Sequence, residues 1–113
     1  MYPGTYEYIG GYLINDDGEF VKSLAGTLKL IKTKYGDYHL EIEVLHPKRG
    51  HMCSFSDFCT RYGKKVICGD KNDSYKYLKY IQIDPDTVYI IKDKEFGFCG
   101  SHVYISGTYK RIK

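Results

Sequence analysis

The sequence contains no tryptophan, almost no alanine and no long run of apolar residues. A membrane-spanning helix needs about 20 consecutive, mostly apolar residues, and no stretch of this chain approaches that length. The first residues also lack the basic and apolar regions of a secretory signal. We therefore expect no membrane span, and the 113 residues 1–113 are sufficient for a single domain.

The net charge of the chain is also small. The 17 basic residues exceed the 14 acidic ones by three, which gives a net charge of +3. Runs of about five or more basic residues usually mark nucleic-acid or membrane patches, and the sequence has none. We interpret the charges as solvated strand faces and expect no nucleic-acid partner.

Motifs for catalysis and cofactor binding are missing. The sequence has no glycine-rich phosphate loop and no recognisable Ser/His/Asp context, and its acidic residues lie in turns or alternate with apolar strand positions. His51 and Cys53 could share a metal ion, but a closed zinc site generally needs two tight ligand pairs. We expect no enzyme activity, no cofactor and no metal.

Tyrosine and glycine are abundant, with 13 and 12 residues, and this composition favours strands and tight turns over helices. The clearest strand is 38–44, where apolar side chains alternate with polar ones. Turn signals recur at intervals of roughly 8–12 residues, which is typical of antiparallel sandwiches and barrels. The eight predicted strands are 4–9, 24–32, 38–44, 51–59, 64–68, 75–83, 87–92 and 102–111.

These strands predict an all-β, antiparallel, eight-stranded up-and-down barrel of the lipocalin-like kind. The segment Gly-Thr-Tyr occurs at both 4–6 and 107–109, which suggests that the first and last strands lie side by side. A short helix at 54–61 or 95–101 is a weaker alternative for those segments. The side chains that we assign to the interior are Leu28, Leu30, Tyr38, Leu40, Ile42, Val44, Phe55, Val88, Ile90, Val103 and Ile105.

The four cysteines are Cys53, Cys59, Cys68 and Cys99, and none forms a Cys-x-x-Cys pair. Disulfides fit a small barrel better than metal or redox chemistry, although three pairings are open to the sequence alone. We favour Cys53 with Cys99, which would join a late loop to the middle of the barrel, and Cys59 with Cys68, which would close a hairpin. Four reduced thiols in a cytosolic domain are the alternative.

The second half of the chain resembles small secreted bacterial β-barrel proteins of the lysozyme-inhibitor-like type. The resemblance rests on His51-x-Cys53-x-Phe55, Cys68, Phe98-Cys99-Gly100 and the closing segment at 107–110. It implies a periplasmic or secreted protein, made with a signal peptide that this sequence does not include, whose activity is binding. The sequence departs from the group at Asp57 and shows no inhibitory loop, so no inhibitory residue is carried over.

Three functions remain open. The first is recognition or inhibition of a protein partner, such as a cell-wall hydrolase or an antibacterial toxin, and the net charge favours a neutral or acidic one. The second is carriage of a small apolar ligand inside the barrel. The third is binding of single-stranded nucleic acid by basic and aromatic residues, namely Tyr75, Lys76, Tyr77, Lys79 and Tyr80.

Overall fold

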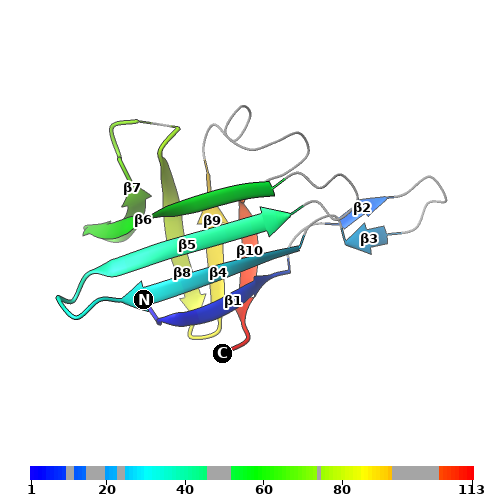
Figure 1. Cartoon of the computed structure of the whole chain (residues 1–113), viewed down its shortest axis with the longest axis horizontal. Helices are drawn as coiled ribbons and strands as arrows, with labels where there is room; N and C mark the ends of the chain where they lie inside the picture. The colour runs from blue at the N-terminus through cyan, green and yellow to red at the C-terminus, as the bar shows by residue number, and fades with distance from the viewer. Residues whose placement is uncertain (10–11, 15–19, 23–24, 46–51, 74, 93–104) are drawn as a thin grey trace.

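A computed structural model describes residues 1–9, 12–14, 20–22, 25–45, 52–73, 75–92 and 105–113. Eight antiparallel strands close into a barrel in the order β1-β10-β9-β8-β7-β6-β5-β4 (Figure 1). The expected eight-stranded up-and-down barrel is therefore confirmed. Its strands are β1 (Gly4–Tyr8), β4 (Ala25–Lys32), β5 (Tyr38–Leu45), β6 (Met52–Tyr62), β7 (Lys65–Gly69), β8 (Tyr77–Asp84), β9 (Thr87–Ile91) and β10 (Gly107–Arg111).

The barrel closes where the first strand meets the last one. In the β1–β10 pair, Tyr6 lies opposite Arg111 and Tyr8 lies opposite Tyr109. The backbone nitrogen of Thr5 donates to the carbonyl of Lys113 over 3.2 Å, so this pairing continues beyond the strand ends. The side-by-side arrangement expected from the repeated Gly-Thr-Tyr is present, and it removes two open sheet edges.

Alternate residues of each strand fill the interior with bulky side chains. Nine of the eleven predicted interior residues are buried, Tyr38 is only partly buried, and Val103 lies outside the described residues. The interior also holds apolar side chains that the sequence reading did not assign: Tyr6, Tyr8, Cys53, Val66, Cys68, Leu78, Tyr80 and Tyr109.

Three features differ from expectation. β6 continues to Tyr62, so a helix at 54–61 is wrong, whereas the alternative helix at 95–101 lies outside the described residues. β10 begins only at Gly107, because Ile105 and Ser106 precede it without strand pairing. A short hairpin that was not expected, β2 (Tyr12–Ile14) and β3 (Phe20–Lys22), lies beyond the ends of β1 and β4 (Figure 1).

Cys59 and Cys68 are joined by a disulfide. They lie directly opposite each other in β6 and β7, so the bond crosses the hairpin as predicted. Cys53 is also disulfide-bonded, and its predicted partner Cys99 lies outside the described residues. Disulfides persist in oxidising compartments, so the bond is compatible with a location outside the cytoplasm.

Within the described ranges, no helix is long and apolar enough to cross a membrane.

Candidate functional site

One section of the barrel wall is incomplete. β7 pairs with β8 only from Val66 opposite Tyr80 to Gly69 opposite Tyr77. β8 itself continues against β9 as far as Asp84. The wall therefore lacks a β7 partner for the last residues of β8, and a cleft of about 400 Å³ lies at this place.

The β6–β7 hairpin and β8 supply nearly all of the cleft lining. This cleft, called the basic cleft below, has four cationic side chains, and none of its described lining residues is acidic. Its lining residues are Met1, Arg61, Lys64, Lys65, Val66, Lys79, Tyr80, Ile81 and Gln82.

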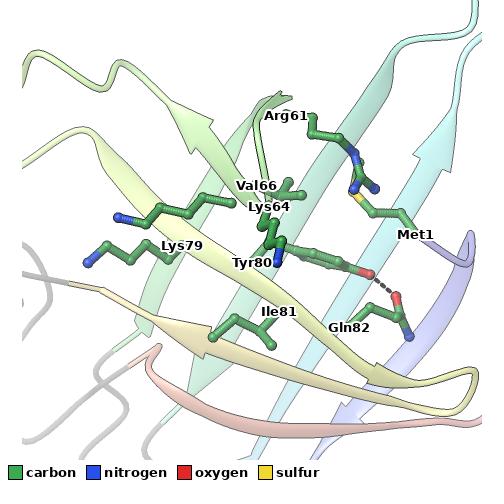
Figure 2. Close-up of a pocket in the computed structure, with 9 residues that line it drawn as sticks. Met1, Arg61, Lys64, Val66, Lys79, Tyr80, Ile81 and Gln82 are labelled. Carbon is green, nitrogen blue, oxygen red and sulfur yellow. Dashed lines mark hydrogen bonds between the residues drawn. The ribbon is translucent and has the colours of Figure 1, made fainter.

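The cations lie on both faces of the wall. Cys53 and Phe55 of β6 are buried, so by alternation Arg61 belongs to the inner face of that strand. Lys79 belongs to the outer face of β8, because its neighbour Tyr80 points inward. Figure 2 shows this opposition, with Arg61 beside Met1 and with Lys79 and Tyr80 extending from β8 in different directions.

Three of the cleft cations have no ion-pair partner among the described residues. The ion pairs between described residues involve Lys76 with Asp73, Arg111 with Asp86 and His39 with Glu41. No carboxylate in the described part of the chain pairs with Arg61, Lys64 or Lys65. The cleft therefore presents a positive field to an incoming ligand.

A polar network closes the barrel beside the cleft. The Tyr80 hydroxyl donates to Gln82 Oε1, and Gln82 Nε2 donates to the Tyr6 hydroxyl over 3.5 Å. Arg111 Nη2 donates to the Tyr6 hydroxyl over 3.2 Å and to the Tyr2 carbonyl over 3.3 Å. The arrangement holds β8, β1 and β10 together at the end of the barrel that carries both termini.

Burial raises the pKa of the Tyr80 hydroxyl far above its ordinary value of 10.0, and Tyr6 raises the pKa further. The folded protein therefore keeps this proton above about pH 10, where the unfolded chain releases it. The contribution to stability is fully present below pH 10 and falls above it by up to about 1.4 kcal/mol per pH unit.

We expect Tyr80→Phe to remove this alkaline slope, as measured by urea unfolding between about pH 9 and pH 11. Tyr35→Phe is the matched control because Tyr35 is 80% exposed, and it should leave the slope unchanged. An unchanged slope in Tyr80→Phe would show that the buried hydroxyl does not control the alkaline loss of stability.

A second group of polar side chains lies on the outer face of β5 and β6. Ser56 Oγ is 3.3 Å from His39 Nε2, and His39 Nδ1 is 3.8 Å from Glu41 Oε1. The order resembles a Ser/His/acid triad, but the carboxylate contact is too long for a hydrogen bond. The His39 ring instead packs edge-on against Phe58. We assign no reaction to this group.

Few of the basic cleft residues were singled out by the sequence reading. Of the residues considered for nucleic-acid binding, only Lys79 and Tyr80 are among the described lining residues of the cleft, and as neighbours in a strand they lie on opposite faces of β8. Arg61, Lys64 and Lys65 were missed as a site. The available signal was their position around Gly63, a turn that brings three cations together within five residues.

Of the two candidate metal ligands, the structure describes only one. His51 lies outside the described residues, and Cys53 is disulfide-bonded. The described residues contain no group of three potential metal ligands.

The comparisons with known proteins leave the family open. No protein-family model, curated protein or solved structure matches the chain. The structure shows an eight-stranded antiparallel β-barrel, and the family implied by the sequence resemblance is not identified.

Proposed function

We propose that this barrel is a non-enzymatic, periplasmic or secreted binding protein that recognises an acidic protein partner through the basic cleft. The partner class that we favour is a cell-wall hydrolase or an antibacterial toxin. The single observation that carries the proposal is the gathering of four cations at a break in the barrel wall, with no carboxylate among the part of the lining that the structure describes.

Electrostatic complementarity of this kind accelerates association and selects against basic partners. Ile81, which is 41% exposed, contributes apolar surface to the cleft, and the buried Val66 also lines it. Apolar surface next to polar and charged side chains is a common composition for a protein-recognition site. The disulfide supports a site of action outside the cytoplasm.

Carriage of an apolar ligand inside the barrel is less well supported. Tyr6, Tyr8 and Tyr109 are all buried, and the Tyr8 and Tyr109 rings pack edge-on at a centroid distance of 5.1 Å. An eight-stranded barrel is only just wide enough to be filled by its side chains or to hold one small ligand. The buried tyrosines favour the filled state.

The experiment compares two charge-reversed variants against a panel of cell-wall hydrolases and toxins with neutral or acidic surfaces. Lys64→Glu combined with Lys65→Glu changes the net charge from +3 to +3 − 4 = −1. Lys32→Glu combined with Lys34→Glu makes the same change on the β4–β5 hairpin. We expect the cleft variant to lose about tenfold or more in affinity and the control to lose less than about threefold.

Binding would be measured by biolayer interferometry, with an activity assay for each hydrolase or toxin. Equal loss in the two variants would show that only net charge matters. Failure of the whole panel, together with a lipid retained in native mass spectrometry, would instead favour the carrier function.

A further inference from the structure

We infer that the basic cleft binds an extended acidic peptide segment, which adds as a β-strand to the edge of β8. This inference rests on the proposed function and specifies how the partner is held. The segment of β8 concerned is 81–84.

The first observation is the edge itself. Ile81 to Asp84 have β9 on one side, through pairs such as Ile81 with Tyr89. On the other side, β7 pairing stops at Tyr80, and no strand among the described residues takes its place. An open strand edge offers backbone N–H and C=O groups to an extended peptide.

The second observation is how the charges are distributed. Arg61 belongs to the inner face of the wall, whereas Lys65 and Lys79 belong to the outer face. A compact anion cannot reach both faces. An added strand can, because its side chains alternate between the two faces. Acidic side chains on such a strand would meet Arg61 on the inside and Lys65 or Lys79 on the outside.

The third observation is the apolar surface beside the edge. Ile81, Ile83 and Tyr89 are 41%, 58% and 37% exposed. Outward-facing apolar residues of an added strand would cover part of this surface, since cross-strand neighbours on one face pack together. The chemistry that fits is therefore an extended segment with glutamate or aspartate on both faces and β-branched residues on the outer face.

A single-stranded nucleic acid fits the same charges less well. Such ligands generally stack their bases on exposed aromatic rings. Tyr80 is the aromatic residue that lines the basic cleft, and it is only 2% exposed. The cleft thus has cations for phosphates but offers no ring surface for bases among its described lining residues.

The test uses the peptide acetyl-Glu-Glu-Val-Glu-Val-amide, which places glutamates on both faces of a strand and both valines on one face, and two N-methylated forms of it. In one form the amides of the first, third and fifth residues are methylated, and in the other form those of the second and fourth residues. Successive amides of a strand point to opposite sides, so only one form loses the hydrogen bonds to β8. We expect that form to bind about tenfold or more weakly than the other, by isothermal titration calorimetry.

Amide NMR shifts should locate the unmodified peptide at 81–84. Arg61→Ala should weaken its binding about fivefold, whereas the matched change Lys32→Ala should weaken it less than twofold. Equal affinity of the two methylated forms would overturn strand addition. Tighter binding of an oligothymidylate than of the peptide, at the same salt concentration, would overturn the assignment to an acidic peptide.

The two proposals fail in different ways. If the peptides do not bind but the Lys64→Glu/Lys65→Glu variant still loses affinity for a protein partner, only strand addition is wrong. If that variant binds the protein partner as tightly as the unmodified protein does, the basic cleft is not the recognition site and the proposed function is wrong.

Discussion

Gly69→Ala is expected to destabilise the barrel by about 3 kcal/mol or more, which places it among the most damaging single substitutions. Gly69 ends β7 with a φ of +98°, a backbone conformation that costs other residues about 1–2 kcal/mol. A Cβ at this position would also lie 2.0 Å from the carbonyl oxygen of Lys76. That oxygen accepts the Asp70 amide over 3.1 Å, so it cannot move without breaking the β7–β8 connection.

Gly36→Ala is the matched control. Gly36 has a similar φ of +88°, but an added Cβ meets nothing within 4 Å. Gly36→Ala should therefore lower the free energy of unfolding only by the backbone cost of about 1–2 kcal/mol. Urea unfolding of both variants measures the difference. Equal losses would mean that the close approach of β7 to Lys76 is not what requires glycine at position 69.

Removing the disulfide with Cys59→Ala and Cys68→Ala is expected to cost about 2–3 kcal/mol. The bond closes a short loop, with a sequence separation of 9, and it stabilises mainly by restricting the unfolded chain. Cys68 is also fully buried, so its truncation adds a packing loss. Because the unfolded variant is less restricted, the denaturant slope m should increase together with the loss of stability.

The control for the disulfide is the neighbouring cross-strand pair, Thr60 and Ile67, which has no covalent link. Thr60→Ala with Ile67→Val should cost less than about 1.5 kcal/mol, since exposed or partly exposed positions lose little. Both variants are unfolded in urea without reductant. A loss below about 1 kcal/mol for the cysteine variant would contradict the stabilising role of the bond.

Most of the barrel could be predicted because local patterns were consistent with the tertiary structure. Alternation along 38–44 placed Leu40, Ile42 and Val44 inside, where they are buried. The helix considered at 54–61 failed because Cys53 and Phe55 are spaced for one strand face, and pairing with β5 extends that pattern. The short hairpin of β2 and β3 was missed because three-residue strands carry too little periodicity to detect.

The basic cleft was not predicted, because it depends on strand register. Arg61 and Lys79 are 18 residues apart in the sequence and carry no shared motif. Their proximity follows from β7 beginning at Lys65 while β8 runs on to Asp84. The sequence reading treated these cations as solvated strand charges, since strand lengths alone do not reveal where a wall is incomplete.

The sequence alone predicted the eight strands of the barrel and favoured the pairing of its first and last strands and the Cys59–Cys68 bond, because alternation, turn residues, the repeated Gly-Thr-Tyr and the spacing of the cysteines can all be read along the chain. The tertiary structure alone decided which tyrosines became interior and where the charges gathered. Those outcomes depend on the offset between neighbouring strands, which is set by the packing of the whole barrel and not by any one segment.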